Sequence, residues 1–305
     1  MKTIVLAGGC FWGVQHYFKQ MRGVLQCTAG YTGGSVADPS YEQVYTDTTG
    51  HAEAVRVTYD EALLPTETLL RRYLCSIDPL SENRQGNDVG TRYRTGIFYT
   101  DPADAAPVRR MLDALGAELG AAPCVQVAPL ETFYPAEDFH QDYLDRNPGG
   151  YCHLPLKLMR YPRVMEEIRS LLEGEADGVA AMAEVACLLQ ERMGFFWTGF
   201  YRVSGEELVL GPFQGPVACL RIGYGKGVCG SAWAQGRTLV VPDVEAFPGH
   251  IACSAESRSE IVVPVFGADG AVSAVLDIDS REPAAFDRAD RHWLEEIVKL
   301  IPVSC

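Results

Sequence analysis

The stretch Gly8-Gly9-Cys10-Phe11-Trp12-Gly13 decides how the first half of the chain folds. An apolar run over residues 3–7 precedes it and predicts a β-strand, and residues 14–19 can form a helix. Cys10 is therefore expected where a strand turns into a helix. The free N–H groups and partial positive charge of a helix N-terminus favour a thiolate there. The two glycines allow a sharp turn, which would leave the sulfur accessible.

Two aromatic residues, Phe11 and Trp12, follow the cysteine directly and can wall a small apolar pocket beside it. A nucleophilic sulfur next to a space for a methyl group suits a substrate with a thioether-like end. The alternative is a buried structural cysteine in a glycine turn, which is the usual state of a lone cysteine. If Cys10 is catalytic, the rest of the first half must supply its partners.

Length and composition limit the classes of protein. A chain of 305 residues suggests two domains, and 47% hydrophobic with 22% charged residues is ordinary for a soluble globular protein. The net charge of -14 argues against nucleic acid or an anionic membrane as a partner. No apolar run approaches the roughly 18 residues of a membrane span, and residues 1–9 are too short for a signal peptide. These features predict a cytoplasmic location.

The cysteine count is high, with 10 in the chain. In a reducing compartment permanent disulfides are not expected, and the spacing does not match a paired zinc motif. Catalytic or transiently oxidised cysteines are the better expectation. Structural or incidental roles are expected for Cys27, Cys75, Cys124, Cys187 and Cys305.

Further along the first half, Glu53 stands among small residues at the start of a predicted strand over residues 54–59. An acid in such a place has a raised pKa and can carry a proton at neutral pH, whereas the alternative is a solvated carboxylate at a strand edge. Residues 78–94 form a long polar loop, which favours a functional role. Residues 136–144 read as a helix. Cys152 lies on a glycine-rich segment from which it could swing to another cysteine.

Several motifs in the first half occur together in one family. They are Gly-Cys-Phe-Trp-Gly (9–13), Gly-His-Ala-Glu-Ala-Val (50–55), Asn-Asp-Val-Gly-Thr-Arg-Tyr-Arg (87–94), Ala-Glu-Asp-Phe-His-Gln (136–141) and Gly-Tyr-Cys (150–152). With these motifs, residues 1 to about 156 resemble the peptide methionine-(S)-sulfoxide reductase family. The resemblance implies a two-layer α/β sandwich with a ferredoxin-like core.

The resemblance also implies a role for each matching residue. Cys10 would attack the sulfoxide sulfur, Glu53 would protonate the sulfoxide oxygen, and methionine would leave Cys10 as a sulfenic acid. Cys152 would then form a disulfide with Cys10, which a thioredoxin reduces by exchange. The remaining implied substrate contacts are hydrogen bonds from Tyr41 and Tyr93, a polar network that includes Asp88, and a methyl pocket formed by Phe11 and Trp12.

The second half begins with helical patterns over residues 164–172 and 179–192 and then becomes rich in strands. The predicted strands cover residues 195–203, 207–213, 217–222, 238–241, 260–266 and 271–277, and a closing helix covers 286–301. This order fits an antiparallel sheet flanked by helices. Asp277 and Asp279 would point to one face of an extended segment, and Trp197 and Tyr201 would share a face of another strand.

Three cysteines of the second half are candidates for chemistry: Cys219, Cys229 and Cys253. Three interpretations compete. The first is packing cysteines beside solvated acids. The second is a metal site that includes His250, although the spacing is not a usual zinc pattern. The third is a redox site.

A second set of motifs favours the redox interpretation. They are Trp-Thr-Gly-Phe-Tyr (197–201), Leu-Gly-Pro-Phe-Gln-Gly (210–215), Ala-Cys-Leu-Arg-Ile (218–222), Gly-Lys-Gly-Val-Cys-Gly (225–230), Gly-His-Ile-Ala-Cys (249–253), Ser-Glu-Ile-Val-Val-Pro (259–264) and Val-Leu-Asp-Ile-Asp-Ser (275–280). Residues 163 to about 301 resemble the free methionine-(R)-sulfoxide reductase family, which has a GAF-type fold. The resemblance implies Cys253 as nucleophile and Cys219 as resolving cysteine, with Cys229 as a third. Its implied substrate contacts are Glu260, Asp277 and Asp279 toward the amino group or sulfoxide and Trp197 toward the methyl group, with Tyr201 lining the pocket.

The sequence thus predicts an α+β protein with two domains, at residues 1–157 and 158–305. We expect a fusion of two reductases that need no metal, flavin or nucleotide and that share thioredoxin as the reductant. The first would act on the S epimer of protein-bound and free methionine sulfoxide, and the second on the R epimer of the free amino acid. The alternative is an S-epimer reductase fused to a GAF domain that only binds a regulatory ligand.

Overall fold

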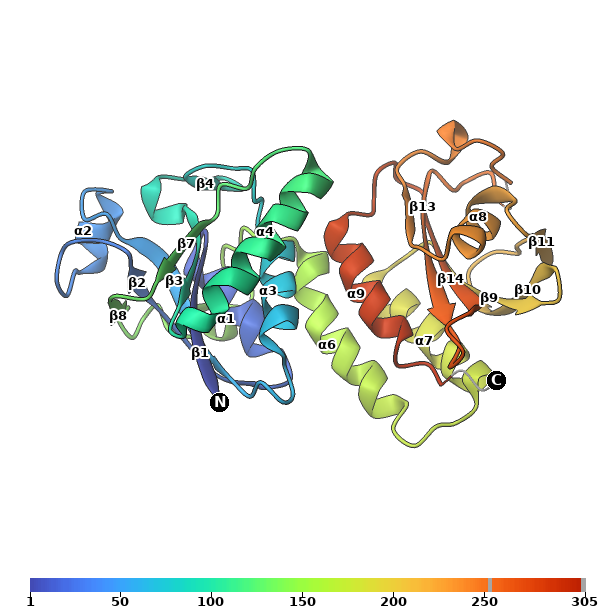
Figure 1. Ribbon diagram of the computed structural model, residues 1–305, viewed down its shortest axis with the longest axis horizontal. Helices are drawn as coiled ribbons and strands as arrows, with labels where there is room; N and C mark the ends of the chain where they lie inside the picture. Colours follow the sequence, from blue (N-terminus) through green and yellow to red (C-terminus); the bar gives the residue numbers. More distant parts are fainter. Residues whose placement is uncertain (252–253, 303–305) are drawn as a thin grey trace. The chain divides into compact units, whose positions relative to one another are not determined.

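The computed structural model describes residues 1–251 and 254–302. The chain divides into two compact units, Met1–Pro162 and Arg163–Cys305, and each is built around one six-stranded sheet with helices (Figure 1). This confirms an α+β fold with two domains. The predicted domain limits, after residue 157, fall within helix α6 (Leu156–Leu171), and they stay a prediction.

The sheet of the first unit has the strand order β7-β6-β1-β3-β2-β8. Neighbouring strands are antiparallel, except that β6 and β7 pair in parallel. Its strands are β1 (Lys2–Gly8), β2 (Val24–Thr32), β3 (Ala52–Tyr59), β6 (Thr95–Tyr99), β7 (Gln126–Pro129) and β8 (Phe133–Pro135), with a separate hairpin of β4 (Arg84–Gln85) and β5 (Asp88–Val89). The helical segments are α1 (Phe11–Lys19), α2 (Tyr41–Tyr45), α3 (Thr66–Cys75), η1 (Thr91–Tyr93), η2 (Pro102–Asp104), α4 (Ala105–Leu119) and α5 (Tyr143–Arg146).

The central strands, in the order β6-β1-β3-β2, are connected through helices α1 and α3 as a ferredoxin-like core. Both helices lie on one face of the sheet, where the Tyr17 hydroxyl of α1 donates to the Arg72 carbonyl of α3 at 3.4 Å. On β1 the residues alternate between the two faces, yet both are buried: Ile4 and Leu6 are no more than 1% exposed, and Val5 packs in an apolar cluster with residues of β3 and β6. The continuous apolar run before Cys10 therefore reflects a strand covered on both sides.

The hydroxyl of Tyr73, on α3, ties the end of β1 to β6. It donates to the Ala7 carbonyl at 2.6 Å and accepts the Gly96 N–H at 3.0 Å, and the side chain is fully buried. Buried backbone groups that lose such a partner are costly, because water cannot replace it. The last residues of β1, which lead directly into Cys10, are thus fixed by a side chain from a helix.

Replacing Tyr73 with phenylalanine should destabilise the first unit by about 1–3 kcal/mol, because the Ala7 carbonyl and the Gly96 N–H lose their buried partner. Urea unfolding of the full chain, followed by near-UV circular dichroism, measures the effect. Tyr99→Phe is the matched control, since the structure gives no hydrogen bond of the Tyr99 hydroxyl among the described residues. Equal midpoints for Y73F and Y99F would contradict this role of Tyr73.

The sheet of the second unit is antiparallel throughout, in the order β11-β10-β9-β14-β13-β12. Its strands are β9 (Trp197–Ser204), β10 (Glu207–Gln214), β11 (Arg221–Gly223), β12 (Leu239–Val241), β13 (Ser259–Phe266) and β14 (Val272–Ser280). The helical segments that follow α6 are α7 (Gly178–Met193), α8 (Gly227–Gln235), η3 (Val244–Ala246) and α9 (Arg288–Val298).

Helices cover both faces of this second sheet. Helix α9 packs on one face and α8 on the opposite face (Figure 1). Trp197 and Tyr201 of β9 both point to the α8 face, where they join an apolar cluster with Val228 and Cys229. The period of two along a strand places residues four apart on the same side, as the sequence predicted for this pair.

Two predicted elements are wrong. Residues 136–144 are mostly turns, and only α5 (Tyr143–Arg146) is helical, because Asp142 has a left-handed backbone with φ 52. The Gln141 side-chain amide instead binds the N–H and carbonyl of Ala29 in β2, each at 2.9 Å. The predicted strand 217–222 is reduced to the short β11, and Val217 is 86% exposed before it. Backbone pairing with β10 reaches back only to Leu220, whose carbonyl accepts the Leu210 N–H at 3.0 Å. Side-chain bonds hold the residues before it, as described below.

Within residues 1–251 and 254–302, no helix is both long and apolar enough to cross a bilayer.

Candidate active sites

The first candidate site lies at the turn from β1 to α1, as predicted. Gly9 has φ +85, and a Cβ on it would lie 2.7 Å from the Cβ of Gln85 and 2.9 Å from Nε2 of His153. Only glycine fits this turn without strain. Cys10 is the N-cap residue of α1, so its sulfur lies at the free N–H groups of the first helical turn.

The protonation of Cys10 differs from the prediction. The residue is only 6% exposed, so its sulfur is not the accessible group that the glycine turn suggested. Burial raises the pKa of the Cys10 thiol well above its usual range, and the neighbouring Glu53 raises it further, although a backbone hydrogen bond from Trp12 acts in the opposite direction. In the substrate-free protein the low-dielectric surroundings outweigh the helix N-terminus, and Cys10 is a thiol at neutral pH.

Glu53 is the nearest acidic partner of this thiol. It lies on β3, is 2% exposed, and its Oε2 accepts the Phe11 N–H at 3.0 Å. Burial raises the pKa of Glu53 to about 8, against the lowering effect of that N–H. The prediction of a raised pKa is therefore confirmed, and at neutral pH this carboxyl group holds a proton.

Two phenols and one further acid surround the pair. Tyr41 begins α2, which Ser40 caps through a capping box, and Tyr93 lies in η1. Burial raises the pKa of Tyr41 to about 12 and also raises that of Tyr93, and the charge of Glu53 adds to both shifts. Both phenols therefore keep their protons and can donate hydrogen bonds. Asp88 accepts the Tyr151 hydroxyl at 2.9 Å, while its Oδ2 is buried without a partner.

The aromatic residues after Cys10 are held by residues to which the sequence analysis gave no role. Trp12 stacks on Tyr143, with ring centroids 3.8 Å apart, and its indole N–H donates to Nδ1 of His140 at 3.1 Å. The His140 ring lies 5.0 Å from that of Phe11 and 4.4 Å from that of Tyr41. Glu137 accepts the Tyr41 N–H at 2.7 Å. Both Glu137 and His140 belong to the motif over residues 136–141. That motif was the feature of the sequence from which their role in the site could have been predicted.

Cys152 lies on the loop before α6 and is half-buried. Its thiol is free, and so is the thiol of Cys10. Its Sγ packs on the first turn of α1, 3.0 Å from where a Cβ of Gly13 would lie. The next residue, His153, is hydrogen-bonded through Nε2 to the Gly8 carbonyl at 2.9 Å. This contact holds the Cys152 loop against the turn that carries Cys10.

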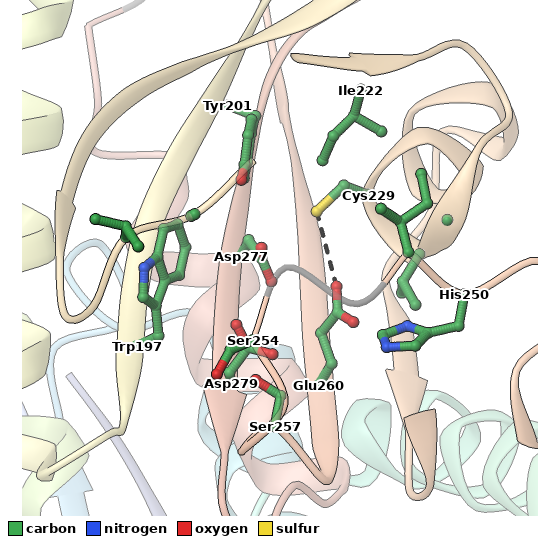
Figure 2. A pocket seen from close by; sticks show the side chains of 15 residues that line it. Trp197, Tyr201, Ile222, Cys229, His250, Ser254, Ser257, Glu260, Asp277 and Asp279 are labelled. Atoms are coloured by element: carbon green, nitrogen blue, oxygen red, sulfur yellow. Dashed lines mark hydrogen bonds between the residues drawn. The ribbon is translucent and has the colours of Figure 1, made fainter. Parts of the chain in front are cut away.

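The second candidate site is a pocket in the second unit. Figure 2 shows Trp197 on one side and His250 on the other, with the carboxylates of Glu260, Asp277 and Asp279 between them. The lining residues include all five predicted substrate contacts of this unit: Trp197, Tyr201, Glu260, Asp277 and Asp279. Strands β9, β13 and β14 supply them, so the predicted shared face of Asp277 and Asp279 is confirmed.

The pairing of strands β13 and β14 brings the three carboxylates close together. Glu260 stands directly opposite Asp279 in the pairing of β13 and β14, and like charges in that relation are unfavourable. Burial raises the pKa of Glu260 and of Asp277 well above the usual range, and raises that of Asp279 to about 6. The mutual repulsion of the carboxylates adds to each of the first two shifts. The pocket therefore favours a cationic ligand.

The cysteines of this unit differ in state. Cys229, on α8, is 3% exposed, and its free thiol donates to Oε1 of Glu260 at 3.7 Å. Cys219 is disulfide-bonded. The predicted nucleophile Cys253 lies outside the residues that the structure describes.

Side chains of β9 anchor the segment that carries Cys219. The Trp197 indole N–H donates to the Pro216 carbonyl at 3.0 Å, and the Tyr201 hydroxyl donates to the Cys219 carbonyl at 3.0 Å. The two aromatic rings also stack, with centroids 6.1 Å apart. Trp197 and Tyr201 thus form the pocket wall and fix the cysteine segment beside it.

Each unit is similar to a known protein family. The family model described as peptide methionine sulfoxide reductase matches residues 2–171, which is more than half of the chain. The chain belongs to the peptide methionine sulfoxide reductase family. A second family model, the GAF domain, matches residues 176–302 of this reductase.

Individual relatives agree with both matches. The reductase is 48% identical to the peptide methionine sulfoxide reductase MsrA of Clostridium acetobutylicum over 160 residues, which cover 52% of this chain and 99% of that protein. It is 49% identical to the free methionine-R-sulfoxide reductase of Neisseria meningitidis, over 50% of this chain and 92% of that one, with a TM-score of 0.47. A putative GAF sensor protein of Burkholderia vietnamiensis is 47% identical over 48% of this chain and 94% of that one, with a TM-score of 0.47.

Proposed function

We propose that the chain is a bifunctional methionine sulfoxide reductase that works in the cytoplasm with thioredoxin as its reductant. The first unit reduces the S epimer of protein-bound and free methionine sulfoxide. The second unit reduces the R epimer of the free amino acid. The observation that carries the first assignment is a thiol, Cys10, beside a buried acid, Glu53, that holds its proton at neutral pH.

The protonation states of the groups in the first site suit attack on a sulfoxide. A sulfoxide sulfur becomes a good electrophile only when its oxygen gains a proton. Glu53 delivers its proton to that oxygen, hydrogen bonds from Tyr41 and Tyr93 support it, and Cys10 attacks the sulfur. The thiol proton of Cys10 then returns to the Glu53 carboxylate. In the adduct, the hydroxyl group then passes to the Cys10 sulfur. The substrate's sulfur–oxygen bond and the new sulfur–sulfur bond both break, methionine leaves, and Cys10 is a sulfenic acid.

Cys152 completes the cycle in this proposal. Its thiol attacks the sulfenic acid of Cys10, a disulfide forms, and the oxygen leaves as water. The dithiol of thioredoxin then attacks the disulfide and becomes oxidised as both cysteines return to thiols. Support comes from the contact of Cys152 with the first turn of α1 and from the free state of both thiols.

The proton on Glu53 gives a pH dependence to the first site. Its raised pKa of about 8 means that the acid is present below pH 8 and lost above it, so single-turnover reduction of the S epimer should slow as pH rises through 8. Glu53→Gln should lower the rate by roughly 10²- to 10⁴-fold and remove this decline. Rapid-quench measurement of methionine formation tests both. A Glu53→Gln variant with the wild-type pH profile would contradict the role of Glu53 as the acid.

In the second unit we propose that Cys253 attacks the sulfoxide sulfur and becomes a sulfenic acid, and that Cys219 forms the disulfide with it. The disulfide-bonded state of Cys219 supports a resolving role. Cys229 has a different environment, since its thiol is buried against Glu260, and it is a less direct participant. The proton of the attack comes from the protonated acids of the pocket, whose pKa values burial raises.

Selectivity for the free amino acid follows from the same acids. A free methionine carries an ammonium group, which a residue within a peptide lacks. Glu260, Asp277 and Asp279 line the pocket together, and the described lining residues include no Lys or Arg to neutralise them. An ammonium group fits there, and Trp197 lies on the wall where the methyl group would pack.

The alternative function is a GAF domain that binds a regulatory ligand and catalyses no reaction. The name of the Burkholderia relative, a GAF sensor protein, is the observation that favours this alternative. A thioredoxin-coupled assay with separated S and R epimers, each free and N-blocked, decides between them. We expect turnover of both free epimers, but of the S epimer alone when blocked. Turnover of the S epimer alone in both forms would support the regulatory domain and overturn the second activity.

A further inference from the structure

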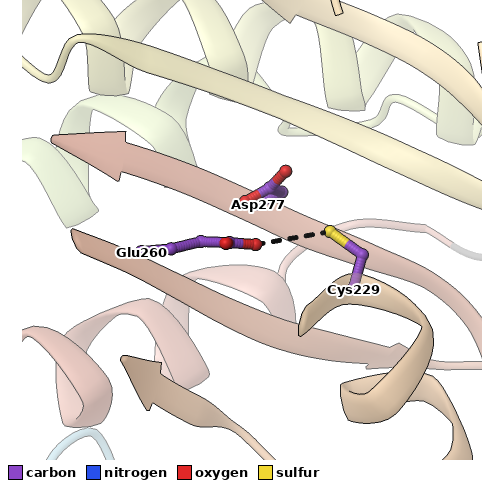
Figure 3. A group of neighbouring side chains, drawn as sticks. All are labelled: Cys229, Glu260 and Asp277. Atoms are coloured by element: carbon purple, nitrogen blue, oxygen red, sulfur yellow. Dashed lines mark hydrogen bonds between the residues drawn. The ribbon is translucent and has the colours of Figure 1, made fainter. Parts of the chain in front are cut away.

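Three buried side chains in the second pocket form a group that could hold a metal ion. The Cys229 Sγ and a carboxylate oxygen each of Glu260 and Asp277 lie within 4.8 Å of one another. Figure 3 shows that they converge from helix α8 and strands β13 and β14. None of the three is more than 7% exposed.

The group has unused capacity to bind a cation. Oδ1 of Asp277 is buried and has no hydrogen-bond partner among the residues that the structure describes. The described residues that line the pocket provide no permanent positive charge. His250 lines the same pocket (Figure 2), and its Nδ1 also has no partner within residues 1–251 and 254–302. A buried orphan oxygen beside a thiol therefore points to a ligand that both atoms can bind.

The donor set and its spacing suit Zn²⁺. Zinc binds cysteine sulfur at about 2.3 Å and carboxylate oxygen at about 2.1 Å in tetrahedral geometry, which separates the two donors by about 3.6 Å. The Cys229 Sγ lies 3.7 Å from Oε1 of Glu260. Mg²⁺ and Ca²⁺ take oxygen ligands, so a sulfur donor selects against them.

We propose that Cys229, Glu260 and Asp277 form a Zn²⁺-binding site whose fourth position opens into the pocket. Binding exchanges the protons of the Cys229 thiol and of the Glu260 and Asp277 carboxyl groups for the ion, and it involves no redox step. A bound ion would occupy the carboxylates that the ammonium group of methionine sulfoxide needs. Zn²⁺ would then inhibit the second unit in competition with substrate, and this consequence rests on the proposed function.

Metal binding to the reduced full-length chain tests the site without any assay of activity. Co²⁺ is the spectroscopic probe, because a cobalt–thiolate bond gives a near-UV charge-transfer band, and Zn²⁺ affinity is measured by competition with a chromophoric chelator. We expect the band in the wild type, and at least about 100-fold weaker Zn²⁺ binding in Cys229→Ser. Cys187→Ser, a half-buried thiol on α7, is the matched control and should bind like the wild type.

A second variant shows whether weaker Zn²⁺ binding in Cys229→Ser comes from the lost ligand or from misfolding. Asp277→Asn keeps the thiol and the side-chain volume, and it should also weaken Zn²⁺ binding. Unchanged affinity in both Cys229→Ser and Asp277→Asn, or the absence of a thiolate band in the wild type, would overturn the site. Added free (R)-methionine sulfoxide should displace the ion. If it does not, while both variants lose Zn²⁺, the metal site stands and the proposed substrate position is what fails.

Discussion

Substitution of Cys10 by serine will lower reduction of the S epimer by at least about 10⁴-fold, because a hydroxyl in place of the thiol cannot form the sulfenic acid. The free R epimer should still be reduced at the wild-type rate, since its proposed site lies in the other compact unit. The measurement is methionine formation from each separated epimer with a thioredoxin system.

The control for this substitution is Cys124→Ser. Cys124 is in the same unit, is exposed and has a free thiol, so its loss tests the general effect of removing a cysteine. We expect normal activity on both epimers. S-epimer activity that survives in Cys10→Ser would show that another group is the nucleophile, and equal loss in C124S would point to misfolding instead.

Substitutions of Cys253 and Cys219 should have different effects on the R epimer. Without a nucleophile, Cys253→Ser should form no methionine from the free R epimer, a loss of at least about 10⁴-fold. Cys219→Ser keeps the nucleophile but lacks the resolving thiol. With the thioredoxin system present it should therefore release about one methionine per chain and then stop, because no disulfide forms for thioredoxin to reduce, whereas the wild type turns over. Quantified product from a single mixing experiment measures both.

Cys229→Ser separates this relay from its alternative. If Cys229 were the resolving cysteine, its serine variant rather than that of Cys219 would stop after one turnover. Cys187→Ser serves again as the neutral control. A Cys253→Ser chain that still reduces the free R epimer would remove Cys253 from the mechanism and leave the buried thiol of Cys229 as the candidate nucleophile.

Local chemistry in the sequence was enough to predict the first turn and its acid. A glycine pair before Cys10 predicts a strand-to-helix turn, and Gly9 adopts the left-handed backbone that the turn needs. Small residues around Glu53 predict burial, and burial raises its pKa. Alternation along a strand predicts the common face of Asp277 and Asp279. These predictions depend on residues that are close together in the chain.

The predictions that failed depend on contacts from distant residues. The Cys10 thiol is buried because segments around Gln85 and His153 close over the turn, and no local pattern reports that. Residues 136–144 were predicted as a helix, but the Gln141 side chain binds the edge of β2 instead. The cluster of Cys229 with Glu260 joins positions 31 residues apart, and only the packing of α8 on the sheet brings them together.

The protonated state of Glu53 has a cost for folding. Its pKa is about 8 in the folded chain against an ordinary value of 4.5, so the unfolded chain loses this proton much more readily. The free energy of unfolding is therefore unaffected below pH 4.5 and decreases as pH rises from there to 8, by roughly 4–5 kcal/mol in total. The same burial that makes this residue a proton donor makes it one of the weaker points of the fold in alkaline solution. Selection for a more robust enzyme would favour an amide here, and selection for catalysis would oppose it.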